Sequence, residues 1–463
     1  MSTDGLAEAR AAMSAAGVPD RAMAVFSDQY RQLESGATGM IHEADIRPLT
    51  DVPRIQDIDT DADRAASALD ATAIIKLNGG LGTSVGLDTA KSLLPVRGTA
   101  TFLDVIVSQI LAVRASRGAR LPLILMNSFR TRDDTLAALA QYPDLVVDGI
   151  PQDFLQNREP KLRADDLTPV RWPADQSLEW CPPGHGDIYT ALSTSGLLTK
   201  LIDAGYRYAS VSNSDNLGAA PDPRIAGWFA ASGAPYAAEV CRRTAADVKG
   251  GYLVVRRSDD RLVLRETAQT PPADAAAAHD IGRHRYFHTN NLWFDLRVLA
   301  DTLDARDGVL GLPMIRNTKT VDPSDPESVP VIQIESAMGA AVEVFDGAMA
   351  IEVPRSRFLP VKTTNDLLLV RSDVYRLDDD SHLIAQLSTA PSIDLDPRFY
   401  KLINAFDRHF PAGPPSLLAA ESLRVRGDWT FGRDVTVTGA VTLEDPGGPD
   451  TVADGTELGP VAG

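Results

Sequence analysis

The sequence predicts a doubly wound α/β domain followed by a small C-terminal β-helix domain. From Ala71 to about residue 380, short apolar segments of strand character alternate with segments of helical periodicity. The apolar segment 72–77 runs straight into a glycine-rich stretch, an arrangement typical of ligand sites in open α/β sheets. Near the C-terminus, pairs of apolar residues recur every six positions, which is a period of β-helices.

Residues 1–70 are expected to form a helical N-terminal segment. Apolar residues recur there at intervals of three and four, first at Leu6, Ala9 and Met13 and again between Met23 and Leu33. Prolines and aspartates mark an irregular lead-in to the first strand. The alanine-rich start also carries acidic residues and lacks the charged-then-apolar pattern of a signal peptide.

A phosphate-binding loop is expected after the strand 72–77. Four glycines fall within the eight residues 79–86, and Lys91 follows them. Glycine lets the backbone approach a ligand closely, and exposed N–H groups at a strand end favour an anion. A P-loop is excluded because Ala90 precedes the lysine, and a dinucleotide fingerprint fits poorly because the second glycine gap is one residue too long. A purely structural turn remains the alternative.

The catalytic domain is expected to span residues 71–380. Beyond the first strand its predicted elements are a helix over 101–113, a strand over 121–126, a helix over 133–140, a strand over 144–150 and a strand over 206–211.

The β-helix is expected within residues 381–445. Its apolar pairs are Leu423 and Val425, Trp429 and Phe431, Val435 and Val437, and Val441 and Leu443. A β-meander with accidental spacing is the alternative. The end of the chain, 446–463, is rich in Gly, Pro and Asp and is expected to be disordered.

The overall composition limits the class of partner. The 463 residues carry a formal charge of −18 with a pI near 4.8, which argues against nucleic-acid or anionic-membrane binding. No run approaches the ~20 apolar residues of a membrane span. The two cysteines, Cys181 and Cys241, match no metal-site spacing or disulfide framework, so we expect a cytoplasmic protein.

Three further segments carry candidate chemistry. In 180–187, two glycines flank His185, which is either a ligand contact or a structural hydrogen-bonding group. In 213–216, Asp215 follows a predicted strand, where it would hold Mg²⁺ or simply cap a helix. In 353–366, three cations interrupt an acidic chain, and Thr364 would cap a helix over 366–374. That cap would place Lys362 beside a positive helix end suited to a polyphosphate, unless the lysine is only a solvated surface charge.

Six motifs together resemble the eukaryotic-type UTP–glucose-1-phosphate uridylyltransferase family. They are 77–83 (LNGGLGT), 182–187 (PPGHGD), 213–219 (NSDNLGA), 266–269 (ETAQ), 289–293 (TNNLW) and 354–366 (PRSRFLPVKTTND). The resemblance covers roughly residues 71–375 in family order. It implies a Rossmann-like nucleotidyltransferase domain with a C-terminal left-handed β-helix. The chain departs from the commoner pattern at Val85, Thr89, Ala90 and Ser214, without losing a charged group.

The resemblance also implies an activity and a set of site residues. The activity is the reversible formation of UDP-glucose and pyrophosphate from UTP and glucose 1-phosphate, with Mg²⁺. Residues implied to hold the nucleotide are Leu77, Asn78, Gly79 and Gly80, with Gln156 and Gly184 at the uracil. Residues implied on the sugar-phosphate side are His185, Asn213, Glu266 and Asn291, the last two on sugar hydroxyls. Asp215 would hold the metal, and Lys91 and Lys362 would neutralise the triphosphate as the catalytic cations.

Two other functions remain open. One is uridylyl transfer to galactose 1-phosphate or an N-acetylhexosamine 1-phosphate. The other is a non-catalytic nucleotide-sugar sensor, which would tend to lose Lys91, Asp215 or Lys362, and all three are present. Homo-oligomerisation through the C-terminal domain is also possible.

Overall fold

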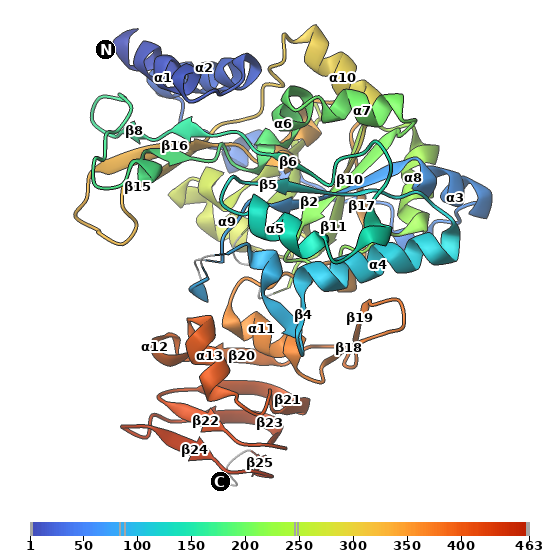
Figure 1. Cartoon of the computed structure of the whole chain (residues 1–463), viewed down its shortest axis with the longest axis vertical. Coiled ribbons are helices and arrows are strands. Elements are labelled where there is room, and N and C mark those ends of the chain that lie inside the picture. The colour runs from blue at the N-terminus through green and yellow to red at the C-terminus, as the bar shows by residue number, and fades with distance from the viewer. Residues whose placement is uncertain (1–2, 83–84, 88, 245–246, 248–249, 460–463) are drawn as a thin grey trace.

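The computed structural model describes residues 3–82, 85–87, 89–244, 247 and 250–459. Within these ranges a large α/β body carries a small, parallel-stranded C-terminal domain at one end (Figure 1). Thr83 and Ser84, which belong to the glycine-rich stretch, lie outside the described residues. No described helix combines the length and the apolar character that a membrane span requires.

A ten-stranded mixed sheet forms the centre of the α/β body. Its main path runs β1-β12-β14-β10-β2-β5-β6, and β11, β13 and β17 attach beside it. The strands are β1 (Ile46–Pro48), β2 (Thr72–Asn78), β5 (Leu123–Asn127), β6 (Asp153–Leu155), β10 (Tyr208–Asn213), β11 (Tyr236–Arg242), β12 (Tyr252–Arg256), β13 (Leu262–Arg265), β14 (Tyr286–Asp295) and β17 (Met349–Glu352). Neighbours in β10-β2-β5-β6 are parallel, whereas β14 is antiparallel to both β10 and β11.

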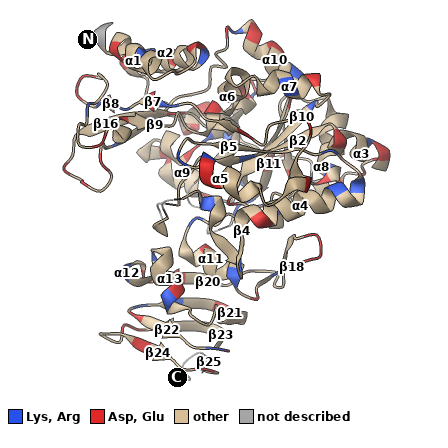
Figure 2. Cartoon of the chain, viewed as in Figure 1, with Lys and Arg blue, Asp and Glu red and all other residues tan. Residues whose placement is uncertain are grey.

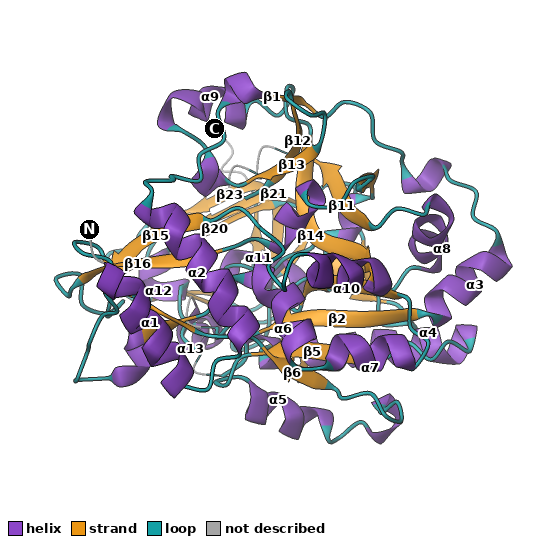
Figure 3. Ribbon diagram, turned by 90° about the horizontal axis from the view of Figure 1, so that it is seen from above, coloured by secondary structure: helices purple, strands orange, loops and turns teal. Residues whose placement is uncertain are grey.

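Helices cover both faces of this sheet (Figure 3), which confirms the α/β class. Successive side chains of β2 point to opposite faces, so Ile74 joins one apolar core while Ala73 and Ile75 join the other. Helices of the first core include α3 (Ala62–Asp70), α4 (Phe102–Arg117), α5 (Arg132–Leu139) and α8 (Pro223–Ser232). Helices of the second core include α6 (Ile188–Thr194), α7 (Leu197–Asp203) and α10 (Leu296–Ala305).

The N-terminal helices pack on a small separate sheet. The prediction that residues 1–70 are helical is confirmed only for α1 (Thr3–Ala15), α2 (Asp20–Glu34) and α3. It is wrong for β1, which is an edge strand of the central sheet because it pairs with β12. The apolar faces of α1 and α2, including Phe26, pack against β8 (Leu162–Arg163) and β16 (Pro330–Glu335), and β15 (Ile315–Thr320) completes that sheet. Short elements elsewhere are β3 (Pro95–Arg97), β4 (Ala100–Thr101), β7 (Glu159–Pro160), β9 (Trp180–Cys181), α9 (Ala275–His279), β18 (Tyr375–Leu377) and β19 (Leu383–Ala385).

The C-terminal domain is built from parallel ladders. One sheet has the order β20 (Ser392–Leu395), β21 (Ser416–Val425), β23 (Thr436–Leu443) and β25 (Glu457–Leu458), and a second pairs β22 (Trp429–Phe431) with β24 (Asp450–Val452). Helices α12 (Pro397–Tyr400) and α13 (Ile403–His409) precede β21. The predicted apolar pairs supply its core, in which Phe431 is fully buried.

Three further local predictions are wrong. The tail 446–463 is not disordered throughout, because β24 and β25 lie in it and buried Val452 pairs with Phe431. Residues 144–150 form a short 3-10 turn and one bridge between Val147 and Ile150, and β6 occupies the adjacent edge of the sheet. Helix α11 (Thr364–Arg371) begins before the expected position, with Thr363 as its cap.

Candidate active site

Two parallel strand ends bring the glycine loop and Asp215 together. Leu77 at the end of β2 is in register with Asn213 at the end of β10. The backbone N–H of Ser214 donates to the Leu77 carbonyl oxygen at 3.2 Å. Both loops therefore leave the sheet side by side at its carboxyl edge, where open α/β folds bind their ligands.

Two lysines from distant parts of the chain converge on Asp215. The Nζ atoms of Lys91 and Lys362 lie 2.8 and 3.0 Å from the same carboxylate oxygen, Oδ2. Burial alone would raise the pKa of Asp215, but the two ammonium groups lower it below its usual range. The backbone of Lys91 also donates to the Gly80 carbonyl oxygen at 3.3 Å, which ties this group to the glycine loop.

This concentration of cations stands out in a molecule with a formal charge of −18. Figure 2 shows acidic residues on several outer helices, including α3, α5 and α10. Two anionic phosphates would repel one another, and the net negative charge of the protein would repel both of them. Local cations at the sheet edge supply the opposite charge that such ligands need.

The second oxygen of Asp215 suits a magnesium ion. Oδ1 is buried and has no hydrogen-bond partner among the described residues. The described residues contain no cluster of three or more His, Cys, Asp or Glu side chains that would enclose a metal. Mg²⁺ takes only one or two protein carboxylates and completes its shell with water and phosphate oxygens. A single free carboxylate oxygen therefore fits this ion.

Residues predicted to bind the nucleotide lie at and beside the end of β2. The side-chain amide of Asn78 donates to Asn127 and Thr135 at 2.8 and 2.9 Å, which anchors the start of the loop. A Cβ placed on Gly79 would lie 2.6 Å from Oε1 of Gln156, so a larger residue there would displace the end of the Gln156 side chain. A Cβ on Gly80 would meet no described atom within 4 Å. The structure brings these residues together, and their roles stay predictions.

His185 is held as a neutral ring. Its Nδ1 accepts the backbone N–H of Met338 at 2.9 Å, which assigns the proton of the neutral ring to Nε2. Burial and the nearby charge of Lys362 lower the pKa of His185 to about 4. Gly184 has φ +79°, and a Cβ there would lie 2.6 Å from the Ser336 carbonyl oxygen. The glycine therefore permits the turn that presents this histidine.

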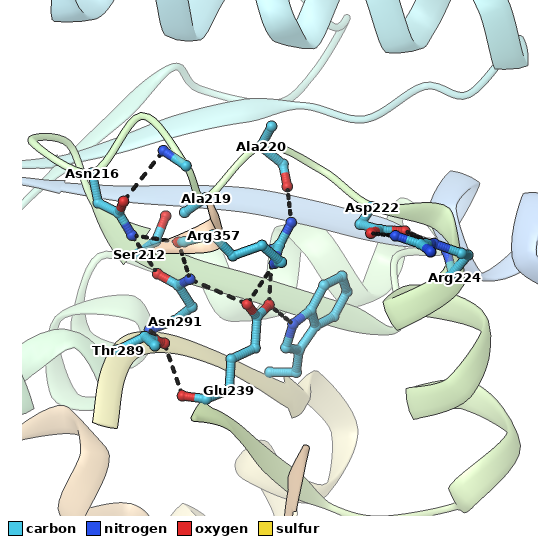
Figure 4. Close-up of polar contacts among 12 residues, drawn as sticks. Ser212, Asn216, Ala219, Ala220, Asp222, Arg224, Glu239, Thr289, Asn291 and Arg357 are labelled. Carbon is cyan, nitrogen blue, oxygen red and sulfur yellow. Dashed lines mark hydrogen bonds and ion pairs between the residues drawn. The ribbon is translucent and has the colours of Figure 1, made fainter. Parts of the chain in front are cut away.

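Asn291, which is predicted to bond sugar hydroxyls, makes its side-chain hydrogen bonds within the protein. It is 2% exposed, and its side-chain nitrogen donates to Glu239 at 3.1 Å and to the Arg357 carbonyl oxygen at 3.2 Å. Its side-chain oxygen accepts from Asn216 at 3.1 Å. Both N–H groups are thus engaged inside the protein (Figure 4), so a sugar hydroxyl could only donate to the side-chain oxygen, and this role stays a prediction.

Several buried charged residues around the site were missed by sequence reasoning. Glu239 and Arg357 form a buried ion pair (Figure 4). Lys76, inside β2, donates to Ser212 and to the Ala219 carbonyl oxygen, and burial lowers its pKa to about 7. A single charged residue within an apolar strand, as at Lys76 and Glu239, is the signal that would have indicated them.

Glu266 is expected to make stability depend on pH. Its carboxylate lies against Gly251, and burial raises its pKa to about 7 from an ordinary 4.5. Between these pH values the folded chain keeps a proton that the unfolded chain releases, so the free energy of unfolding falls as pH rises. Glu266→Gln should reduce this fall by up to about 1.4 kcal/mol per pH unit. Urea unfolding of both proteins from about pH 4.5 to about pH 8 measures the difference, and parallel pH curves would contradict the prediction.

Comparison with known proteins places this chain in a family. The family described as UTP–glucose-1-phosphate uridylyltransferase matches residues 23–438. The UTP–glucose-1-phosphate uridylyltransferase of Solanum tuberosum is 41% identical over 380 residues, covering 81% of this chain and 77% of the relative. That of Saccharomyces cerevisiae is 39% identical, covering 81% and 74%.

The solved structures agree. UDP-glucose pyrophosphorylase from Leishmania major, described in open and closed structures, superposes with a TM-score of 0.93 at 40% identity and covers 99% of both chains. A single-residue variant of the Leishmania major enzyme in complex with UDP-glucose superposes with a TM-score of 0.92 at 39% identity, again covering 99% of both chains.

Proposed function

Because the chain belongs to the UTP–glucose-1-phosphate uridylyltransferase family, we propose that it forms UDP-glucose and pyrophosphate from UTP and glucose 1-phosphate, reversibly. The observation that carries this proposal is the convergence of Lys91 and Lys362 on Asp215 at the edge of the sheet. This arrangement gathers positive charge beside a glycine-rich loop, as two phosphate-bearing substrates require.

The reaction is an in-line displacement at phosphorus. A phosphate oxygen of glucose 1-phosphate attacks the α-phosphorus of UTP, and the bond to the β-phosphate breaks as pyrophosphate leaves. Such transfers depend on positioning and charge stabilisation, so no covalent nucleophile is needed. Lys91 and Lys362 neutralise the oxygens of the attacking and leaving groups. A magnesium ion held by Asp215 would add further positive charge on the phosphate oxygens.

The remaining residues bind and orient the substrates in this proposal. Leu77, Asn78, Gly79 and Gly80 cradle the nucleotide, while Gln156 and Gly184 contact the uracil. His185 donates from Nε2 toward the sugar phosphate, because its Nδ1 is occupied by Met338. Asn213 precedes Asp215 in the same loop, and Glu266 contacts the sugar. Asn291 accepts from a sugar hydroxyl through its side-chain oxygen, because its two N–H groups bond Glu239 and the Arg357 carbonyl oxygen.

The proposal also covers the finer architecture. The parallel ladders of the C-terminal domain and its six-residue repeat support a left-handed β-helix, which would offer a surface for self-association. Two buried free cysteines, Cys181 and Cys241, support a reducing, cytoplasmic location.

Pyrophosphate release tests the activity directly. The purified chain is incubated with UTP, Mg²⁺ and one sugar 1-phosphate at a time: glucose, galactose, N-acetylglucosamine or N-acetylgalactosamine. We expect the highest kcat/KM with glucose 1-phosphate. Highest efficiency with another sugar would reassign the substrate, and release with none of them would favour a non-catalytic sensor.

Removing divalent cations is expected to stop the reaction. With EDTA in excess, pyrophosphate release should fall to background. No divalent cation is then present to bind Asp215 and to offset the negative charge of the phosphates. Added Mg²⁺ should restore the rate, whereas the same concentration of Na⁺ should not. An undiminished rate in EDTA would contradict the assignment of a metal to Asp215.

A further inference from the structure

The chain segment that delivers Lys362 is anchored by a buried arginine shortly before it in the chain. The guanidinium of Arg357 contacts both oxygens of Glu239, with Nε–Oε2 at 2.7 Å and Nη2–Oε1 at 2.9 Å. Its Nη1 also donates to the Ala220 carbonyl oxygen at 2.9 Å. Arg357 is 9% exposed and Glu239 is 0% exposed, so the pair is shielded from water.

Glu239 is itself fixed by the sheet. Its carboxylate lies on β11 and accepts from Trp293 Nε1 at 3.0 Å and from Asn291 Nδ2 at 3.1 Å, both on β14 (Figure 4). With Arg357 added, this carboxylate accepts four hydrogen bonds. The arginine therefore binds to a carboxylate held rigidly by two neighbouring strands.

The backbone beside Arg357 is held as tightly as its side chain. The Arg357 carbonyl oxygen accepts from Asn216 at 3.1 Å and from Asn291 at 3.2 Å, and the N–H of Leu359 donates to Asn216 Oδ1 at 2.8 Å. Gly218 completes the fit, because a Cβ there would clash with the Ser356 carbonyl oxygen.

These contacts connect the buried pair to the reaction centre from two directions. Asn216 directly follows Asp215, and the N–H of Val361 donates to the Asp215 carbonyl oxygen at 3.2 Å. Lys362 comes next in the chain and places its ammonium on the Asp215 carboxylate. The side chain of Lys362 is 56% exposed, so its own packing does little to fix its position.

We propose that Arg357 and Glu239 are positioning residues, whose buried ion pair holds the 356–362 segment so that Lys362 meets the reacting phosphates. The proposal rests on the role of Lys362 in the proposed function. A buried ion pair is commonly no more stabilising than apolar residues of the same volume, so stability alone does not account for it. The precise placement of Lys362, the next cation in the chain, accounts for the pair.

The test compares kcat, KM and thermal unfolding for Arg357→Met, Lys362→Ala and the double variant. Arg357→Met should lower kcat on the order of 10²-fold, the scale of a misplacement of about 1 Å, with a smaller change in the KM for UTP. If Arg357 acts through Lys362, the double variant should stay within about threefold of Lys362→Ala alone. Independent losses that multiply would overturn the proposal.

Arg355→Met is the matched control. Arg355 belongs to the same turn, and its guanidinium bonds Asp247 at 2.6 and 2.8 Å rather than Glu239. The Arg355→Met variant should keep kcat within about threefold of the wild type, because the substitution moves no reacting group.

A second variant decides the question if Arg357→Met fails to fold. Gly218→Ala leaves every charge in place but pushes on the Ser356 carbonyl, so it should also lower kcat strongly while the chain stays folded. Folded Gly218→Ala or Arg357→Met with near-wild-type kcat would overturn the positioning role alone. A wild type that releases no pyrophosphate would instead overturn the proposed function, and this inference with it.

Discussion

Asp215→Asn is expected to lower kcat for pyrophosphate release on the order of 10³-fold, by analogy with the upper end of the range for losing one preorganised oxyanion donor. The substitution keeps the side-chain shape but removes the negative charge that holds Lys91 and Lys362 together. It also replaces one of the two carboxylate oxygens by an amide nitrogen. One of these oxygens, Oδ1, is the candidate magnesium ligand. Steady-state assays at saturating UTP and glucose 1-phosphate measure the effect.

Asp222→Asn is the matched control for this variant. Asp222 caps α8 and pairs with Arg224 (Figure 4), so its carboxylate is also held within the protein. Its hydrogen bonds are to Arg224, whereas those of Asp215 are to the two lysines. Asparagine is an equally good cap, so the control should keep both its fold and its kcat. An Asp215→Asn protein with kcat within about tenfold of the wild type would show that this carboxylate does not organise the reaction.

Lys362→Ala is expected to keep the fold and lose turnover by on the order of 10²–10³-fold, by analogy with the loss of one oxyanion donor. The side chain is 56% exposed and packs little, so its removal creates no cavity. It does remove one of the two cations that offset the repulsion between substrates. We expect kcat to fall more than the affinity for UTP, because the charge matters most as the phosphates meet.

Lys319→Ala tests whether this loss is specific. Lys319 is 52% exposed and lies on β15, where it contacts Gln333 and Glu335. Both variants remove one exposed cation from the same acidic chain, so they share any effect of net charge. Equal activities in the two proteins would reject the role assigned to Lys362.

The parts of the site that could be predicted from the sequence depend on local patterns. A buried strand followed by clustered glycines indicates the loop at residues 79–82, because both features lie within a few residues. The same holds for Asp215, which lies two residues after the end of β10. The meeting of Lys91 with Lys362 follows only from the resemblance to a family, since no local rule joins residues so far apart in the chain.

Contacts between residues distant in sequence could not be predicted. Asn291 sits in a motif of exposed-looking polar residues, yet Glu239 on the neighbouring strand takes its amide. The composition after Asp445 indicates disorder. Val452 on β24 is nevertheless buried, because it pairs with Phe431 on β22. In both cases tertiary contacts outweigh local preference.

A crystal structure of the complex with UDP-glucose tests the central claim most directly. We predict that the phosphate oxygens lie within hydrogen-bonding distance of the Nζ atom of Lys91 or Lys362, with the uracil beside Gly79 and Gln156. The chain also has a groove of about 410 Å³ between α11 and α13, lined by Pro95, Leu368, Arg371 and Phe406. UDP-glucose bound in that groove, or with its phosphates away from both lysines, would contradict the account.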